Sequence, residues 1–285
     1  MSRRFGVALS ASVCFALSVA GGAMADGLHP DPNVAGLQTA LKLKGYYRGE
    51  IDGLRGPLTS AAVRAFRRHV RLGSSSLIDR RTRSAMGVLG RPGYGTRLLR
   101  RGQVGLDVAA LQFELRYHGF AAPADGVFGK RTALSLKRFQ RFAHVKADGV
   151  AGLTTYSALE QPPPTVPRLR SPLSVLERTR RHGNAVEIAC PYAAAVAASI
   201  GGKVIFAANR AGGYGYTVVI RNRRGLELLF AHLARIDVRR GERLVAGAAV
   251  GLAGWTGKKQ PEASLRVELR LRGAQLDVYE ALNGR

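Results

Sequence analysis

Cysteine and acidic residues are scarce in this sequence, and each shortage restricts what the protein can be. Among 285 residues there are 2 cysteines, and 19 Asp and Glu stand against 44 Lys and Arg. Cys14 lies in a predicted N-terminal leader, so Cys190 would be the one cysteine of the mature chain and an internal disulfide is excluded. Stability must therefore come from packed hydrophobic cores.

Long apolar runs and strong compositional bias are also missing. Beyond the first 25 residues no apolar stretch is long enough to span a membrane, so an integral membrane protein is not expected. With 35 Gly and 12 Pro the composition is neither collagen-like nor of low complexity. A hydrophobic content of 46% is enough for a core, and the length suits two or three domains of roughly 100–200 residues.

The shortage of acids gives the chain a formal net charge of +25. Such a chain is attracted to polyanions, which include nucleic acid, an anionic membrane surface and an anionic polymer such as a bacterial wall. The alternative is a general basic bias in which the excess charge only solvates the surface. Composition alone does not choose among these.

The first 25 residues have the pattern of a secretory signal. Arg3 and Arg4 precede an apolar run over 5–20, and Ala23 and Ala25 supply the small residues of a cleavage site. An uncleaved anchor is disfavoured, because the run of about 16 residues is shorter than the roughly 20 that span a membrane. We expect a secreted protein of the cell wall or periplasm with a mature charge of +23, for which nucleic acid is an unsuitable partner.

Residues 34–68 and 108–141 repeat one pattern of Leu-Gln, Gly-aromatic, Asp-Gly and Gly-x-x-Thr. The matching pairs are Leu37 and Leu111, Gln38 and Gln112, Leu41 and Leu115, Gly45 and Gly119, Asp52 and Asp125, Gly53 and Gly126, Thr59 and Thr132, and Phe66 and Phe139.

Each repeat is predicted to fold as three short helices. Apolar spacing from Val34 onward predicts the first helix, and Gly45 stands where its left-handed C-cap is needed. Thr59 is predicted to cap the second helix, and third helices are expected to begin near Thr82 and Thr155.

The runs 102–112, 125–132 and 148–155 resemble type 1 peptidoglycan-binding domains, whose turns follow the pattern D-G-x-x-G-x-x-T. The first repeat departs from this pattern at residues 75–79, which replace its second turn. The resemblance implies noncovalent binding to peptidoglycan without saying which residues touch the polymer. The Gly and Asp residues of the turns are interpreted mainly as turn formers.

Three aromatic residues are candidate binding residues in these repeats. Tyr46, Tyr47 and Phe120 follow the first helices and, if exposed, could stack on sugar rings. The alternative, held equally open, is that they belong to the cores.

Residues 161–181 contain five prolines and several arginines, which predicts an extended, semi-rigid linker. Beyond it, β-branched runs punctuated by glycines predict an all-β unit. The order of the runs 201–204, 213–220, 230–233 and 254–257 resembles the LytM or lysostaphin-type zinc metallopeptidases. Members of that family cleave peptide cross-links in peptidoglycan.

The resemblance assigns the family's metal and catalytic positions to Gly183, Glu187, His232, Ser264 and Arg266. Catalytic zinc is held by three protein ligands and a water, but here one carboxylate remains and two imidazoles are replaced. Arg266 is a permanent cation that cannot coordinate a metal. Only a slip of one residue would bring His182 into the position of Gly183, so no metal is expected.

Two further interpretations concern the remaining side chains of this set. The guanidinium of Arg266 is predicted to pair with Glu187 in place of zinc, the alternative being that both point to solvent. His232 is interpreted as a remnant of the family's catalytic histidine, and more simply as a hydrogen-bonded strand histidine.

The expected fold is a multidomain α plus β protein with two three-helix peptidoglycan-binding domains and a C-terminal all-β LytM-like domain of the duplicated hybrid motif type. Because most zinc ligands are missing, whether the protein is an enzyme is left open, and an inactive domain is favoured.

The expected function is wall binding, or regulation of a murein hydrolase such as an amidase. The alternative is a divergent zinc murein endopeptidase built on Glu187, His182 and His232. The expected domains are a signal peptide at 1–25, repeats at 34–88 and 98–160, a linker at 161–181 and the LytM-like domain at 183–282.

Overall fold

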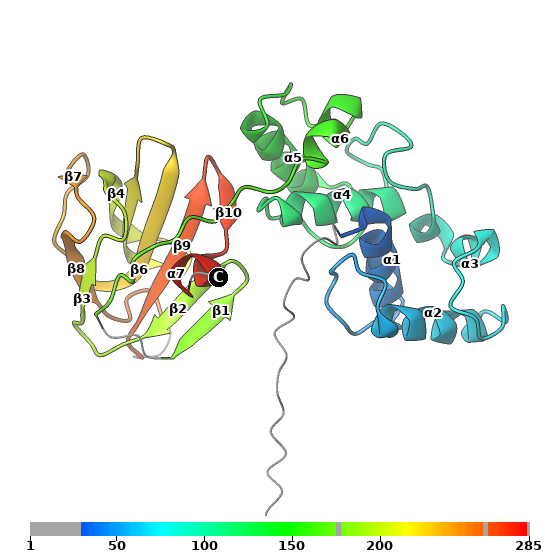
Figure 1. The fold of residues 1–285 in the computed structure, drawn as a ribbon, viewed down its shortest axis with the longest axis horizontal. Helices are drawn as coiled ribbons and strands as arrows, with labels where there is room; N and C mark the ends of the chain where they lie inside the picture. Colours follow the sequence, from blue (N-terminus) through cyan, green and yellow to red (C-terminus); the bar gives the residue numbers. More distant parts are fainter. Residues whose placement is uncertain (1–29, 175–177, 259–261, 284–285) are drawn as a thin grey trace, which may run out of the picture.

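The computed structural model describes residues 30–174, 178–258 and 262–283, and the predicted signal peptide lies outside these residues. Helices form the N-terminal part and strands form the C-terminal part (Figure 1). This arrangement confirms the predicted α plus β fold class. Across the described residues, no helix combines the length and the apolar character that crossing a membrane needs.

The first repeat contains α1 (Pro32–Leu43), α2 (Pro57–His69), α3 (Arg80–Ala85) and a 3₁₀ turn, η1 (Gly87–Gly90). Helix α1 begins at Asp31, whose carboxylate accepts a hydrogen bond from the backbone N of Asn33 at 2.8 Å. Pro32 suits the first turn because its missing N–H has no partner to lose there. The helices enclose a core that contains Leu37, Leu41, Phe66 and Met86.

The second repeat contains α4 (Leu106–Tyr117), α5 (Lys130–Phe142) and α6 (Leu153–Leu159). Its core contains Val108, Leu111, Leu115, Phe120 and Phe139. The two repeats pack against each other, because Leu106 at the start of α4 is buried in the core of the first repeat. The side chain of Asn33 also accepts a hydrogen bond from the backbone N of Tyr94, 3.0 Å away.

Thr59 does not cap α2, which corrects the prediction. The N-cap is Gly56, and Thr59 lies inside the helix with 2% exposure. Its hydroxyl is 3.0 Å from Nε2 of Gln38, a fully buried residue of α1. The Oε1 of Gln38 accepts from the backbone N of Asp52 and Gly53 at 3.1 and 3.0 Å. The conserved spacing between the repeats therefore reflects a buried glutamine that holds the Asp-Gly turn against the helix.

Arg67 stabilises the loop that replaces the second Asp-Gly turn in the first repeat. In the second repeat Gln140 bonds to Gly149 N at 2.9 Å and lies 3.2 Å from the Thr155 hydroxyl. Arg67 occupies the same place in α2, and its guanidinium donates to Leu72 O at 2.7 Å and Leu77 O at 3.0 Å. A longer cationic side chain thus organises the different loop.

The C-terminal part is an antiparallel sheet in the strand order β1-β2-β9-β6-β5-β4-β7, with β10 paired to β9 and β8 paired to β3 and β6. The strands are β1 (Thr179–His182), β2 (Ala185–Ala189), β3 (Ala195–Ala197), β4 (Gly202–Arg210), β5 (Gly215–Arg221), β6 (Leu226–Ile236), β7 (Arg243–Leu244), β8 (Ala249–Ala253), β9 (Ser264–Leu271) and β10 (Ala274–Leu276), followed by α7 (Val278–Asn283). Inward-facing residues such as Ile188, Phe230 and Val267 fill one core.

The predicted linker is extended but is not a free spacer. Residues 161–178 contain no helix or strand in their described part. Leu169 and Leu173 are buried in the core of the β domain, and Leu169 N donates to Ala281 O at 2.8 Å. The second half of this segment is therefore attached to the sheet and to α7.

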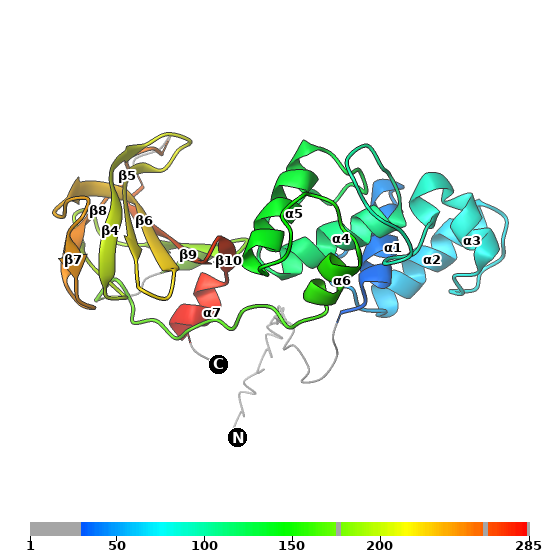
Figure 2. The ribbon, with the colours of Figure 1, turned by 90° about the horizontal axis from the view of Figure 1, so that it is seen from above.

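The helical and β parts meet where β10 approaches the end of α4, as both ribbon views show (Figures 1 and 2). Gln275 N donates to Gly119 O at 2.8 Å, and Ala274 is buried in the core of the second repeat. Gly119 has a φ of 83°, and a Cβ added there would lie 2.2 Å from Gln275 O. The close approach of the two parts therefore requires glycine at this position.

We expect Gly119→Ala to open this junction, whereas Gly45→Ala at the equivalent position of the first repeat should not. Gly45 has a φ of 80° but no atom within 4 Å of an added Cβ. Both variants are destabilised by about 1–2 kcal/mol, because alanine is strained at a positive φ. Only Gly119→Ala also loses the hydrogen bond and the packing across the junction, which removes another roughly 1–2 kcal/mol. Small-angle scattering should show a larger radius of gyration for Gly119→Ala alone. Equal radii for the two variants would refute a junction that depends on Gly119.

Candidate functional site

The family-derived positions are brought together on strands β2, β9 and β6. Glu187 of β2 faces Arg266 of β9 as a Cα pair, and Ala231 of β6 faces Arg266 from the other side. Ser264 is the first residue of β9, and His232 directly follows Ala231 in β6. Because neighbouring antiparallel strands place paired side chains on one face, Glu187, Ser264 and Arg266 share a surface. Gly183 is separate, since it lies in the turn between β1 and β2.

A lysine that sequence reasoning missed occupies the centre of this site. Lys258 Nζ donates to Glu187 Oε1 at 2.6 Å, to Ser264 Oγ at 3.0 Å and to Glu262 O at 3.0 Å. The hydroxyl of Ser264 also donates to Glu187 Oε1 at 2.6 Å. The only signal in the sequence is the position of Lys258 directly after the glycine-rich run 254–257.

These contacts set the charge of Glu187. Burial alone would raise the pKa of this carboxyl, but hydrogen bonds from Lys258 and Ser264 and the charge of Lys258 lower it to about 2. The carboxylate is therefore ionised at neutral pH, and its Oε1 already accepts hydrogen bonds from both Lys258 and Ser264. The resulting ion pair is only 18% and 19% exposed.

Because the folded-state pKa of Glu187 lies below its usual value, this group stabilises the fold above about pH 4.5 and loses that effect as the pH falls toward 2. We expect the wild-type chain to lose about 2 kcal/mol more unfolding free energy between pH 5 and 2 than Glu187→Gln does. Urea unfolding at both pH values measures this difference. Parallel pH dependences in the two proteins would contradict the assignment.

Arg266 does not pair with Glu187, which corrects the predicted ion pair. Its guanidinium instead donates to Glu268 Oε1 at 2.9 and 3.0 Å. Glu268 is 2% exposed, so its charge needs close partners, and Arg270 and the hydroxyl of Tyr214 also donate to it, each at 2.8 Å. The alternative of two solvent-directed side chains is wrong as well, because both side chains are partly buried and hydrogen-bonded.

His232 is a buried histidine with 6% exposure and a φ of 64°. Its Nδ1 lies 3.0 Å from the carbonyl oxygen of Thr256, which can only accept, so Nδ1 carries the proton. Burial lowers the pKa of His232, and Lys258 and Arg266 lower it further, which outweighs the Thr256 bond and the charge of Glu187. The ring is therefore neutral at pH 7, with Nε2 as an acceptor, in agreement with the simpler interpretation.

His182 is closer to Glu187 than the family resemblance suggested. Its Nε2 lies 3.4 Å from Glu187 Oε2, on the side away from Lys258, and the imidazole is 48% exposed. A cavity of about 340 Å³ adjoins this group and is also lined by Arg178 and Arg180. The surroundings of the carboxylate are thus strongly cationic.

The residues of this site do not fit a zinc ion. Catalytic zinc needs three protein ligands, and within the described ranges no group of three His, Cys, Asp or Glu is placed to hold a metal. Of the nearest side chains, Glu187 and His182 are potential ligands, but Lys258 binds the same carboxylate. A cation at that distance repels a divalent ion, so the donor set is both incomplete and blocked.

Two of the three candidate sugar-stacking residues are buried, which agrees with the alternative that they belong to the cores. Tyr47 is 4% exposed and Phe120 is 2% exposed, because both pack into the cores of their repeats. Tyr46 is partly buried against Phe66, with ring centroids 5.4 Å apart. Tyr47 and Phe120 therefore offer no open face to a sugar, whereas Tyr46 keeps part of its surface exposed.

An exposed aromatic pair lies elsewhere, beside the site in the β domain. Tyr192 and Trp255 are 57% and 38% exposed, and their ring centroids are 4.4 Å apart. Trp255 belongs to the same loop as Thr256 and Lys258, so the pair borders the Glu187 group. Sequence reasoning missed it because nothing in the sequence placed position 192 next to 255.

Comparisons with known families and proteins agree with this architecture. The model of "Peptidase family M23" matches residues 181–278, and that of "Putative peptidoglycan binding domain" matches residues 30–86 and 104–159. The spore cortex-lytic enzyme of Bacillus cereus is 39% identical over 67 residues, which are 23% of this chain and 26% of the enzyme. The DD-carboxypeptidase/endopeptidase Mpg of Neisseria meningitidis serogroup B is 34% identical over 99 residues, 35% of this chain and 22% of that protein.

This chain therefore spans about a quarter of the length of these curated relatives. Among solved structures, lysostaphin from Staphylococcus simulans matches with a TM-score of 0.33 and 21% identity over 35% of this chain and 43% of that one. A zinc-containing peptidase from Vibrio cholerae matches with a TM-score of 0.31 and 28% identity over 38% of this chain and 36% of that one.

Proposed function

Since the chain consists of tandem peptidoglycan-binding domains followed by a domain of peptidase family M23, we propose that it is a secreted wall-binding protein whose M23 domain no longer hydrolyses peptidoglycan. The observation that carries this proposal is the ammonium of Lys258, 2.6 Å from Glu187 Oε1. A carboxylate that neutralises a lysine is not available to a metal, and without the metal this family has no activated water.

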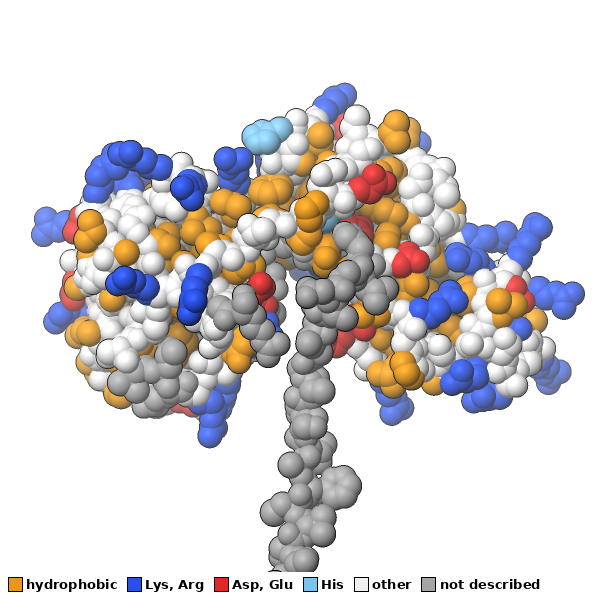
Figure 3. All heavy atoms as spheres, viewed as in Figure 1, with side chains coloured by type: hydrophobic (Ala, Val, Ile, Leu, Met, Phe, Trp, Pro, Cys, Tyr) orange, Lys and Arg blue, Asp and Glu red, His pale blue; other side chains and the backbone are white. Residues whose placement is uncertain are grey.

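Wall binding is supported by the repeats and by the charge. The positive side chains are spread over both parts of the molecule on the face shown in Figure 3, with no single basic patch. Two linked binding domains raise overall avidity through effective concentration, so each can be weak. The mature charge of +23 adds long-range attraction to an acidic polymer, and this contribution is screened by salt.

The M23 domain would then act as a binding surface. The exposed Tyr192–Trp255 pair and the cationic group around Glu187 form a polar site with an aromatic border. Surfaces of this composition are typical of sites that bind a protein or a peptide. The proposed partner of this inactive, wall-bound M23 domain is a murein hydrolase such as an amidase. The proposed role is regulation of that hydrolase at the wall.

A second candidate function is a divergent zinc endopeptidase. The contact of His182 with Glu187 at 3.4 Å and the neutral His232 favour it, because they place one further ligand and one base near the carboxylate. Its relatives include proteins named as a spore cortex-lytic enzyme and a DD-carboxypeptidase/endopeptidase. Lys258 opposes it, since this lysine must leave before a metal can bind.

One experiment tests the proposal: incubation of the mature chain with purified peptidoglycan, with and without added zinc, at rising salt. We expect retention at low salt that falls at least about tenfold between 50 and 500 mM salt, no lysis in either arm, and an altered rate when an amidase is added. Lack of retention would reject wall binding. Zinc-dependent lysis, which the chelator EDTA abolishes, would support the endopeptidase instead.

A further inference from the structure

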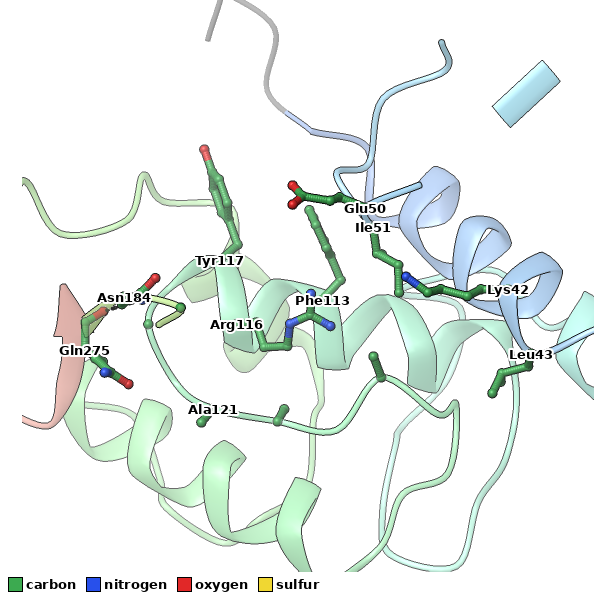
Figure 4. Close-up of a pocket in the computed structure, with 14 residues that line it drawn as sticks. Lys42, Leu43, Glu50, Ile51, Phe113, Arg116, Tyr117, Ala121, Asn184 and Gln275 are labelled. Carbon is green, nitrogen blue, oxygen red and sulfur yellow. Dashed lines mark hydrogen bonds between the residues drawn. The ribbon is translucent and has the colours of Figure 1, made fainter. Parts of the chain in front are cut away.

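A large cavity lies outside the Glu187 site, at the junction of both repeats and the β domain. Its volume is about 890 Å³, and it is lined from α1, α4, the loop after α4, the β1–β2 turn and β10. Figure 4 shows Lys42 and Arg116 reaching toward one another across this space from α1 and α4. Neither repeat forms the cavity by itself, and of the family-derived positions it is lined by Gly183, which lies apart from the Glu187 group.

Arg116 is the unusual side chain in this cavity. It is half-buried at the end of α4, and burial lowers its pKa. In the described part of the chain its guanidinium has no hydrogen bond, ion pair or ring contact. Half-buried guanidinium groups are normally paired, because five unsatisfied donors removed from water cost free energy. The guanidinium of Arg116 therefore lacks a hydrogen-bond acceptor, and a bound ligand would supply one.

The other charges around the cavity also favour an anion. Lys42 is the second cation, and its Nζ donates to Gly49 O at 3.0 Å, which leaves further donor capacity. Among the described lining residues Glu50 is the one acid, and it forms no ion pair with Lys42 or Arg116. Two cations that converge without a shared carboxylate repel each other, and an anion between them relieves that repulsion.

The remaining walls are apolar and small. Leu43, Ile51, Ala121, Ala122 and Ala124 line one side, and Phe113 stacks on Tyr117 at the other with centroids 6.1 Å apart. Backbone and amide groups are available as well, since Gln275 and the β1–β2 turn reach the cavity from the β domain. A trough of methyl groups and amides with a cationic anchor matches a short peptide rich in small residues that carries a carboxylate.

We propose that this three-part cavity binds the stem peptide of peptidoglycan, with a peptide carboxylate held by Arg116 and Lys42. This inference rests on the proposed wall-binding function and adds the binding site and the recognised group. The guanidinium pairs with the carboxylate through two parallel hydrogen bonds, and the alanine-rich wall accommodates the alanine side chains of the peptide. The ligand also touches the β1–β2 turn, so binding fixes the β domain against the repeats.

The test is calorimetric titration of the full mature chain with L-alanyl-γ-D-glutamyl-L-lysyl-D-alanine. We expect saturable binding, and a loss of at least about tenfold in affinity for Arg116→Gln, since a charge-assisted hydrogen bond is removed. The matched control is Arg138→Gln, which removes the same charge from an exposed residue of α5 in the same repeat and should leave the affinity within about twofold. Amidation of the peptide carboxylates should weaken binding as much as Arg116→Gln does, and acetate should bind far more weakly.

Several outcomes would overturn the site. These are no saturable binding, equal losses for Arg116→Gln and Arg138→Gln, or unchanged affinity for the amidated peptide. Arg116→Gln removes an unpaired charge and should not lower the melting temperature, so misfolding does not explain a loss. Retention on whole peptidoglycan is measured in parallel: retention without peptide binding rejects this cavity alone, whereas loss of both rejects the wall-binding function.

Discussion

Replacing Gln112 with leucine should unfold the second repeat at temperatures where the wild-type repeat is folded. Gln112 is fully buried in α4, with its Nε2 2.9 Å from the Thr132 hydroxyl and its Oε1 accepting from Gly126 N at 2.9 Å. Leucine has a similar volume but leaves these groups without partners, and each buried unsatisfied group costs about 1–3 kcal/mol. We expect a loss of about 3–5 kcal/mol in unfolding free energy, and calorimetry should show a melting temperature lower by more than about 10 °C for this unit.

The matched control is Gln161→Leu, which makes the same substitution at an exposed side chain just after α6. Surface changes of this kind usually alter stability by less than about 0.5 kcal/mol. A Gln112→Leu protein as stable as Gln161→Leu would show that the buried amide is not what holds the turn.

The second large effect concerns metal binding at the Glu187 site. The double variant Lys258→Ser, Arg266→His removes the blocking ammonium and places an imidazole directly across from Glu187 in the strand register. With His182 already 3.4 Å from the carboxylate, one carboxylate and two imidazoles would then meet. This is the ligand number of catalytic zinc sites, and we expect zinc affinity at least about 100-fold above that of the wild-type chain. Isothermal titration with zinc measures it.

The single variant Arg266→His is the control that isolates Lys258. It supplies the same third imidazole but keeps the ammonium on Glu187, so its zinc affinity should stay close to that of the wild type. In both variants Arg270 and Tyr214 remain to neutralise and hydrogen-bond the buried Glu268. Equal zinc affinities for the single and double variants would show that Lys258 does not block the site.

The helical repeats were predictable because their signals are local. Apolar spacing and the glycine after α1 gave the correct helices, and Gly45 does adopt a positive φ. The role of Gln38 was missed, because a glutamine within an amphipathic helix ordinarily faces solvent. Thr59 was wrongly predicted to cap α2, because its actual partner, Gln38, is 21 positions away and a local pattern does not reveal it.

The candidate site was only partly predictable. The resemblance to a known family was enough to group Glu187, His232 and Ser264, because it implied the pairing of their strands. It did not reveal Lys258, whose contact with Glu187 joins a loop to a strand 71 positions away. It also placed Arg266 on the wrong carboxylate, since the sequence does not show that Glu268 is buried two residues further along β9.

The attachment of residues 161–178 to the sheet decides where the β domain can be separated from the rest. Leu169 and Leu173 contribute to its core, and Pro172 O accepts a hydrogen bond from Ala197 N at 2.8 Å. A fragment that starts at the first strand would lack both leucines, each worth roughly 2–3 kcal/mol when buried. A recombinant version of the C-terminal unit therefore has to start upstream of Val166, inside the proline-rich stretch.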